Sequence, residues 1–268
     1  MYIQVFVYLY KRKGVGFFMK LHPFMAVLGS SALLGAAELK PIGAWNMENI
    51  QGSVVKACIG PDGRIVNSGK NASAVPGRSG GTALHITGGW TNEDRNKNGA
   101  LVIPKFAPRH DQSFSIVFDF KLDADEGNKN FRKFKTLVES ADGERGPGFR
   151  VFIFYGSLSF RTGDGKKNMQ HVSASSATVR IPTQRWARLA VVHNAEDKTA
   201  TLYLDGVKVA HGAMNIKPSR QKNLVFGSYR EGFANPATAA YDNIKLYDKA
   251  LTAGDVAADY LDTLKKDI

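Results

Sequence analysis

The sequence predicts an all-β fold in which two antiparallel sheets pack as a jelly-roll sandwich, followed by a short C-terminal helix. Short segments of alternating apolar and polar residues recur along most of the chain, separated by glycine, asparagine or aspartate. Turn residues return roughly every 8–12 positions, and a single segment near the C-terminus shows helical spacing. Many short strands without intervening helices are typical of sandwiches and jelly rolls, and these often form one domain of about 200–250 residues.

The clearest strands lie in the middle of the chain. Residues 114–122 carry apolar side chains at every second position, which predicts a strand with one buried face. Residues 149–155 are apolar at nearly every position, as in a strand that is covered on both faces. Gly156 then predicts a tight turn into a second strand at 157–162, so the two segments form a hairpin.

Further hairpins are predicted in the C-terminal half. Residues 189–193 and 200–204 are apolar runs joined by a polar loop, and Asp205-Gly206 leads from the second run into 207–210. Asp-Gly between two apolar runs is a strong hairpin signal, because both positions of a type I′ turn need a positive φ. Later strands are predicted at 224–226 and 240–247.

One helix is predicted after the last strand. Thr252 and Asp255 have the spacing of a capping box, and Val256, Tyr260 and Leu264 then recur at helical intervals. The helix therefore begins just after Thr252 and presents one apolar stripe to the sandwich.

The first 37 residues resemble a signal peptide. A basic segment without acidic residues precedes an apolar run at 24–34, and small residues at 35–37 suit a cut before Glu38. The apolar run is shorter than the roughly 20 residues that cross a bilayer. We expect a secreted, periplasmic or cell-envelope protein with one domain at 38–268 and no transmembrane span in the mature form. Met19 is the start of a more compact signal, and a retained N-terminal anchor is the alternative.

The net charge indicates which class of partner to expect, and the cysteine count shows whether an internal disulfide can form. The formal net charge is +12 and stays positive without the signal segment, which favours anionic partners such as acidic polysaccharide. The basic residues are scattered and form no nucleic-acid-binding motif, so a nucleic acid partner is not expected. Cys58 is the only cysteine, so no internal disulfide can form, and the strand-like run around it predicts a buried side chain.

The C-terminal third resembles a known family. The resemblance rests on a tryptophan-led strand, an Asp-Gly hairpin, an apolar strand ending in glycine, and a closing strand before a short helix. These segments are 186–192, 202–206, 224–227 and 240–251. A glycine turn at 76–86 and a strand from Ser113 fit the early part more loosely. Together they resemble the laminin-G-like jelly-roll domains of the concanavalin A-like lectin/glucanase superfamily, which implies the fold but leaves function open, since lectins, adhesion modules, hydrolases and lyases share it.

The catalytic patterns of that superfamily are mostly missing. The Glu-x-Asp-x-Glu strand of its glucanases does not occur, and neither do serine-hydrolase or zinc motifs. Gln170-His171 resembles one of the three strands of alginate-type lyases, where His171 would act as base or neutraliser while Arg150 and Arg161 bind a uronate carboxylate. The other two motifs of such lyases are absent, so a lyase is the alternative and a non-catalytic protein the leading expectation.

The resemblance also implies a structural calcium ion that ties the first strand to the last. By position, Glu48 and Asp242 would supply carboxylates, with backbone oxygens near Gly88. The alternative is that Asp242 only pairs locally. A second acidic segment at 94–99 opens like an EF-type loop, but Lys105 stands where the bidentate glutamate is needed, so a solvated loop is expected there.

Sugar binding needs an aromatic ring beside polar groups. Trp90 lies in a glycine-rich loop and Tyr229 in a polar one, so both are candidate ligand-binding residues together with Arg150, and packing against the protein's own surface is the alternative. Trp45 and Trp186 lie in strand-like runs and are expected in the core. The leading hypothesis is an exported, non-catalytic carbohydrate- or matrix-binding module, stabilised by calcium. An acidic-polymer lyase and a structural or adhesion protein of the envelope are the alternatives.

Overall fold

The computed structural model describes residues 39–109, 111–124, 133–141, 147–166, 168–215 and 223–266. The predicted signal peptide at 1–37, with its alternative start at Met19, lies outside the described residues and stays a prediction. Among the residues described, no helix has the length and apolar character needed to cross a membrane.

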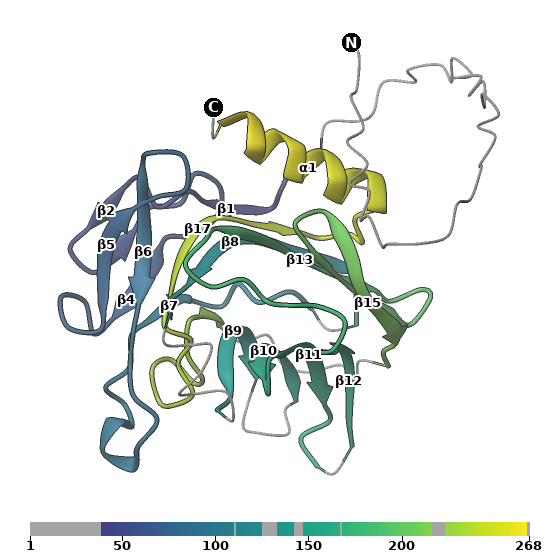
Figure 1. The fold of residues 1–268 in the computed structure, drawn as a ribbon, viewed down its shortest axis with the longest axis horizontal. Helices are drawn as coiled ribbons and strands as arrows, with labels where there is room; N and C mark the ends of the chain where they lie inside the picture. The colour runs from purple at the N-terminus through teal and green to yellow at the C-terminus, as the bar shows by residue number, and fades with distance from the viewer. Residues whose placement is uncertain are drawn as a thin grey trace, which may run out of the picture. The chain divides into compact units, whose positions relative to one another are not determined.

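Two antiparallel sheets face each other across one core, and a C-terminal helix lies against one of them (Figure 1). Sheet A has the strand order β15-β14-β13-β8-β17-β6-β5, with β1 also paired to β17; sheet B has the order β12-β11-β10-β9-β16-β7-β4-β3-β2. The strands of sheet A are β1 (Gly43–Trp45), β5 (Ala72–Pro76), β6 (Thr82–Ile86), β8 (Phe114–Leu122), β13 (Ala187–Asn194), β14 (Thr199–Leu204), β15 (Val207–Ala213) and β17 (Ala239–Tyr247). The strands of sheet B are β2 (Ile50–Gln51), β3 (Val54–Val55), β4 (Gly63–Val66), β7 (Ala100–Ile103), β9 (Lys135–Ala141), β10 (Gly148–Phe154), β11 (Ser157–Gly163), β12 (Met169–Ala174) and β16 (Leu224–Phe226). The predicted all-β sandwich is confirmed.

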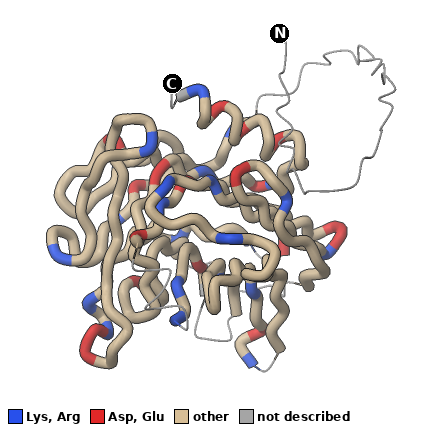
Figure 2. Tube along the Cα trace, viewed as in Figure 1, with Lys and Arg blue, Asp and Glu red and all other residues tan. Residues whose placement is uncertain are grey.

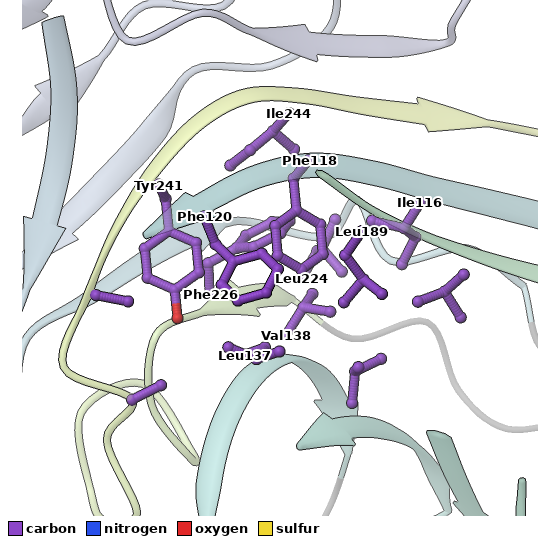
Figure 3. Close-up of a cluster of buried hydrophobic side chains, with 14 of the residues drawn as sticks. Ile116, Phe118, Phe120, Leu137, Val138, Leu189, Leu224, Phe226, Tyr241 and Ile244 are labelled. Atoms are coloured by element: carbon purple, nitrogen blue, oxygen red, sulfur yellow. The ribbon is translucent and has the colours of Figure 1, made fainter. Parts of the chain in front are cut away.

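Alternation along the strands builds the core. Ile116, Phe118 and Phe120 of β8 point between the sheets, where they meet side chains of β9 and β16 (Figure 3). The rings of Phe118 and Phe226 lie edge to face with centroids 5.4 Å apart, which joins sheet A to sheet B. Each fully buried side chain of this size contributes about 1.5–3 kcal/mol to stability, so these rows stabilise the face-to-face packing.

The other face of β8 is also buried, which the half-buried prediction for this strand missed. Ser115, Val117 and Asp119 are at most 1% exposed, because the helix α1 (Ala253–Lys266) lies across this face of sheet A. Val117 belongs to a second apolar cluster that includes Val256 of the helix. The strand therefore has partners on both sides.

The helix begins where the sequence predicts. The Thr252 backbone N–H donates to the Asp255 carboxylate at 2.9 Å, and the Asp255 N–H donates back to the Thr252 hydroxyl at 3.1 Å. This reciprocal pair is the capping box that the spacing predicts. The hairpin turn at Asp205-Gly206 is confirmed as well, with φ of 50° and 77° at the two positions.

Two side chains lie elsewhere than predicted. Trp186 is half-buried rather than in the core. Ala187 and Leu189 are the residues of β13 that face inward, and Trp186 lies one position before Ala187, so its side chain does not point to the same side. Its ring lies under the Lys121 ammonium, 5.7 Å from the nitrogen. Cys58 is exposed rather than buried, because β3 ends at Val55 and the chain leaves the sheet before the cysteine. Trp45 is fully buried, as predicted.

The charged residues are spread over the whole domain. Figure 2 shows lysine and arginine segments interspersed with acidic ones over strands, loops and the helix. Among the described residues in this view, the lysines and arginines are therefore interspersed with acidic residues rather than gathered into one stripe of the kind that binds a nucleic-acid backbone.

Candidate functional site

Four of the polar residues of sheet B stand in one row across four strands. Glu139 of β9 pairs with Arg150 of β10, Arg150 with Arg161 of β11, and Arg161 with His171 of β12. Directly paired residues share a face of a sheet. Their neighbours along the strands, such as Val138, belong to the core, so the row lies on the face of sheet B that turns away from sheet A. The register thus brings the three predicted lyase residues together on one outward face.

Arg150 is engaged by the protein itself. Its Nε donates to Glu139 Oε2 at 3.0 Å, and the side chains of both are at most 4% exposed. The second carboxylate oxygen of Glu139 accepts the Arg230 backbone N–H at 2.6 Å. Burial raises the pKa of Glu139 to about 7, even though Arg150 and the Arg230 N–H favour the ionised form. The pair therefore anchors the loop after β16 to the sheet.

Tyr229 of that loop covers Arg150. The guanidinium carbon lies 3.8 Å from the centroid of the Tyr229 ring, and the tyrosine is 6% exposed. Burial raises the pKa of the Tyr229 hydroxyl above its ordinary value. Two predicted ligand-binding residues, Tyr229 and Arg150, are thus packed against each other rather than presented to solvent.

The row opens to solvent at its other end. Arg161 is half-buried, with its guanidinium carbon 5.2 Å from the centroid of the Phe152 ring, and His171 is exposed. Two residues further along the strands, the hydroxyls of Ser159 and Ser173 lie 2.7 Å apart. This part of the face offers a guanidinium, an imidazole and hydroxyls to a ligand.

Aromatic side chains border this open part. Trp90 is half-buried and its Nε1 donates to the Phe134 carbonyl at 3.3 Å. The Phe134 ring stacks on Phe154, with centroids 4.0 Å apart and planes within 3°. Phe154 in turn contacts Tyr155, which is 42% exposed. We call Trp90, Phe134, Phe154 and Tyr155 the aromatic rim.

Sequence reasoning found only Trp90 of the rim. The run 149–155 predicts a strand covered on both faces, yet Phe154 is half-buried and Tyr155 exposed. The available signal was the turn: Tyr155 and Gly156 form a two-residue hairpin loop with φ of 48° and 70°, and a loop tip points away from the sheet.

The predicted calcium ligands lie on either side of one glycine turn. Both Glu48 carboxylate oxygens accept the Thr82 N–H at 3.2–3.3 Å, and Asp242 Oδ2 accepts the Arg78 N–H at 3.1 Å. A Cβ on Gly81 would lie 1.9 Å from Glu48 Oε1, so the Glu48 carboxylate occupies the space that a side chain at position 81 would need. Asp242 precedes a bulge in β17, and such bulges re-aim side chains. Burial raises the pKa of Asp242 to about 6, and the charges of Asp119 and Glu48 add to this.

This donor set fits a hard cation. Two carboxylates and the backbone oxygens of one turn are the ligand types that calcium prefers. Within the described ranges no three His, Cys, Asp or Glu side chains converge as a metal site, so backbone oxygens would have to complete the shell. The predicted help from Gly88 is not supported, because Gly88 follows the opposite end of β6, against Asn98.

The acidic segment at 94–99 is a closed loop. Asp94 Oδ2 accepts the Thr91 hydroxyl at 2.6 Å and the Thr91 N–H at 2.9 Å. These hydrogen bonds from Thr91 lower the pKa of Asp94. The carboxylate is therefore used to cap a short turn, as expected for a solvated loop.

Comparison with known proteins agrees with this architecture. A family model described as the concanavalin A-like lectin/glucanases superfamily, of the laminin G type, matches residues 94–257. No curated protein matches the sequence.

Solved structures share the fold at low sequence identity. The binding domain of Paraclostridial Mosquitocidal Protein 1 is 17% identical with a TM-score of 0.61, over 82% of this chain and 51% of that one. The botulinum neurotoxin serotype D binding domain is 13% identical with a TM-score of 0.59, over 84% and 51%. Domain 4 of AbnA, a GH43 extracellular arabinanase from Geobacillus stearothermophilus in complex with arabinotriose, is 16% identical with a TM-score of 0.60, over 83% and 98%. The chain thus spans about half the length of the toxin domains and nearly all of the arabinanase domain.

Proposed function

The chain belongs to the concanavalin A-like lectin/glucanases superfamily, and on that premise we propose that it is an exported, non-catalytic module that binds a polysaccharide. The proposed binding surface is the open part of the outward face of sheet B, between the aromatic rim and the pair Arg161–His171. Export is proposed from the signal-like segment at 1–37 alone.

One observation carries the proposal: aromatic rings and polar groups lie side by side on this face. Stacking on a ring together with hydrogen bonds to hydroxyls is the usual combination in sugar recognition. Tyr155 stands at one end of β11 and Gly163 at the other, and a seven-residue strand is about 20 Å long. The face is therefore long enough for an oligosaccharide rather than a single sugar.

The fold neighbours support a binding role. The toxin domains are binding domains, and the arabinanase domain was solved with arabinotriose. The positive net charge and the pair formed by half-buried Arg161 and exposed His171 further favour a polysaccharide that carries acidic groups.

We also propose that a calcium ion stabilises the domain at Glu48 and Asp242. Bound there, the ion would neutralise two carboxylates that lie close to each other and would hold the turn at 77–81 against the last strand. In this proposal Glu48 and Asp242 bind the calcium ion, and Gly81, which has no side chain, leaves room for the Glu48 carboxylate.

The binding surface is tested with two matched variants. Tyr155→Asn removes an exposed ring at a position where asparagine tolerates the positive φ. Val207→Asn removes an exposed apolar side chain from β15 of sheet A, away from the proposed surface. We expect polysaccharide pull-down and affinity electrophoresis to show binding, weakened about tenfold in Tyr155→Asn, or about 1.4 kcal/mol, and unchanged in Val207→Asn. Failure to retain any plant, algal or bacterial polysaccharide would overturn the function, and equal binding by both variants would overturn the surface.

A lyase acting on an acidic polymer is the second candidate, because His171 is exposed and directly paired with Arg161. In such a reaction His171 would take the C5 proton of a uronate, the bond from C4 to the glycosidic oxygen would break as a C4–C5 double bond forms, and the departing oxygen would take up a proton from water. Arg150 cannot assist in its present position, because Glu139 and Tyr229 hold it. Ultraviolet absorbance of unsaturated products that disappears in His171→Ala would establish the lyase in place of the non-catalytic module.

A further inference from the structure

Two loops on the outward face of sheet B are joined to each other. The first loop connects β6 to β7 and spans residues 87–99; the second loop connects β16 to β17 and spans residues 227–238. The Asn96 N–H of the first loop donates to the Phe233 carbonyl of the second at 3.1 Å. This hydrogen bond ties the position of one loop to that of the other.

The second loop lies close against the sheet. Val225 of β16 is directly paired with Glu139, so the two side chains share the outward face. Val66 packs against the small apolar cluster that contains Val225, and a Cβ on Gly232 would lie 3.2 Å from Val66 Cγ1. Glycine at position 232 therefore lets the second loop approach this face.

Two arginines lie over one aromatic ring where the loops meet. The guanidinium carbon of Arg95, from the first loop, lies 5.3 Å from the centroid of the Phe233 ring. That of Arg230, from the second loop, lies 5.8 Å from the same centroid. Both arginines are exposed, whereas Phe233 is half-buried. We call these three side chains the arginine site.

The guanidinium groups of this site have donors to offer to a ligand. A guanidinium carries five N–H donors and no acceptor, and contact with a ring does not use them up. Within the described ranges, the side chains of Arg95 and Arg230 donate no hydrogen bond and form no ion pair. Their contacts there are with aromatic rings alone.

The carboxylates of the two loops do not neutralise the arginines by direct contact. Asp94 accepts the Thr91 hydroxyl at 2.6 Å, and Glu231 accepts from Arg64 Nη2 at 2.8 Å. Glu93 is exposed and forms no ion pair in the part of the chain that the structure describes. The positive charge of the arginine site therefore faces solvent.

The backbone of the second loop is strained at this site. Arg230 and Glu231 have φ of 50° and 55°, a region that residues other than glycine, asparagine and aspartate rarely adopt. The Arg230 N–H donates to the buried Glu139 carboxylate at 2.6 Å, which holds the strained residue in place. Strain of this kind lowers stability and is typical of ligand-binding segments. It therefore favours a functional role for the side chain that the loop presents.

A site of this composition suits an oxyanion. Guanidinium groups bind such groups through charge-assisted hydrogen bonds, which are roughly twice as strong as neutral ones. An oxyanion beside the Phe233 ring is attracted by both positive charges, whichever guanidinium it touches. The ring also excludes water from one side of the site, which strengthens the attraction.

The arginine site borders the aromatic rim. Trp90 of the rim belongs to the first loop, and its Nε1 donates to the Phe134 carbonyl. Two residues after Phe134, the Thr136 N–H donates to the Asn235 carbonyl of the second loop at 3.0 Å. Both loops are thus attached to the segment that carries the rim.

We propose that Arg95 and Arg230, gathered around the Phe233 ring, bind an oxyanion substituent of a polysaccharide, either a carboxylate or an ester sulfate. This assignment deepens the proposed function and rests on it. It adds a second place for acidic groups besides the pair Arg161–His171, so the loops as well as the strands of sheet B select acidic polymers.

The test uses the full chain with two matched pairs of polymers. One pair is a uronate polysaccharide and its carboxyl-reduced form, and the other is a sulfated polysaccharide with a neutral backbone and its desulfated form. Arg95→Gln and Arg230→Gln each remove one charge from the site. Arg185→Gln removes the same charge from an exposed arginine that pairs with Asp205 of the β14–β15 hairpin in sheet A. Thermal unfolding shows that each variant folds.

We expect an acidic polymer to bind more tightly than its neutral counterpart, and the pair of polymers that differs identifies the oxyanion. Each substitution in the site should weaken binding about fivefold, as for loss of one exposed charge pair, and Arg185→Gln should leave it unchanged. Inorganic sulfate followed by NMR should shift the side-chain Nε–H signals of Arg95 and Arg230 but not that of Arg185.

The two proposals fail in different ways. Binding of an acidic polymer that is unchanged in both site variants, or equally weakened in Arg185→Gln, overturns the arginine site and leaves the binding surface intact. Equal affinity for acidic and neutral polymers overturns the oxyanion as its ligand. If the wild type retained no polysaccharide, the proposed function would fail, and the sulfate-induced shifts would separately support or refute an oxyanion site.

Discussion

The guanidinium of Arg150 lies over the ring of Tyr229, with its carbon 3.8 Å from the ring centroid. A cation over an aromatic face is attracted by the ring quadrupole, most strongly where water is excluded. The contact joins β10 to the loop after β16, and Glu139 holds the same arginine from β9. Two side chains that the sequence assigns to ligand binding are therefore buried and hold the loop after β16 against sheet B.

The buried pair Glu139–Arg150 should be essential for stability. We expect Arg150→Met to destabilise the domain by about 3–5 kcal/mol, because it leaves a buried carboxylate without its partner. The double variant Glu139→Gln/Arg150→Met should recover part of this loss, since no charge is left unpaired. Guanidinium-induced unfolding measures the free energy of unfolding of the single and the double variant. A loss below about 1 kcal/mol in Arg150→Met would show that the pair is dispensable.

Glu139 should also make stability depend on pH. Its pKa is about 7 in the folded protein against an ordinary 4.5, so the folded state binds the proton more tightly. The stabilisation that the folded state gains from binding this proton is fully present below pH 4.5 and is lost as the pH rises to about 7. His193 acts in the opposite sense, since burial lowers its pKa from 6.5 to about 4 and stability falls as the pH drops through that range.

Because the two effects oppose each other, the difference between variants is the informative quantity. Relative to the wild type, Glu139→Gln should lose the fall in unfolding free energy between about pH 4.5 and 7 and keep the part due to His193. Urea unfolding at several pH values gives both curves. Parallel curves would contradict the assigned role of Glu139.

The fold was predictable because its signals are local. The turn at Asp205-Gly206 needs a positive φ, and the cap at Thr252 needs a residue three positions on; both are visible in the sequence and both are confirmed. The sequence predicts Arg150, Arg161 and His171 as one candidate site, but their alignment in a row with Glu139 was not predictable, because it depends on the register of four strands and on an extra residue, Leu137, in β9. A shift of one residue would move every side chain of a strand to the other face.

Exposure was equally hard to predict for side chains that a distant segment covers. Tyr229 lies in a polar loop that suggests exposure, yet it folds onto Arg150, 79 positions earlier in the sequence. Asp119 lies on the polar side of an alternating strand but is fully buried, because the side chains of Arg78, Arg188 and Asn243 surround its carboxylate. Neither contact has a local signal.

Calcium should raise the thermal stability of the domain. An ion that binds only the folded state at about 100 times its dissociation constant adds about 2.7 kcal/mol. We expect the unfolding temperature to rise with added calcium and to fall with a chelator. Glu48→Gln and Asp242→Asn should each remove the response, whereas Asp62→Asn, an exposed carboxylate paired with Lys56, should keep it. An unfolding temperature that is the same with calcium and with chelator would rule out the ion.

Asp119 of β8 and Asp259 of α1 should stabilise the domain to different extents: Asp119 the whole fold, Asp259 mainly the helix. Asp119 accepts from Arg78 Nη1 and Arg188 Nη1, both at 2.9 Å, and from Asn243 Nδ2 at 2.9 Å, and it is fully buried. We expect Asp119→Asn to cost about 3–5 kcal/mol in global stability, because two buried guanidinium groups lose their shared counter-charge.

Asp259 lies on the helix and accepts from Arg188 Nε and, at 2.7 Å, from Lys245 Nζ. The substitution Asp259→Asn removes the charge that ties α1 to sheet A, but Asp119 still binds Arg188. Hydrogen exchange should therefore speed up in α1 while the strands of sheet A stay protected, since local opening of one element needs less free energy than global unfolding. Asp262→Asn, at an exposed carboxylate of the same helix that pairs with Lys265, is the control and should leave exchange unchanged. If Asp259→Asn accelerated exchange equally in α1 and in β8, the helix would be part of the cooperative core rather than a separately anchored element.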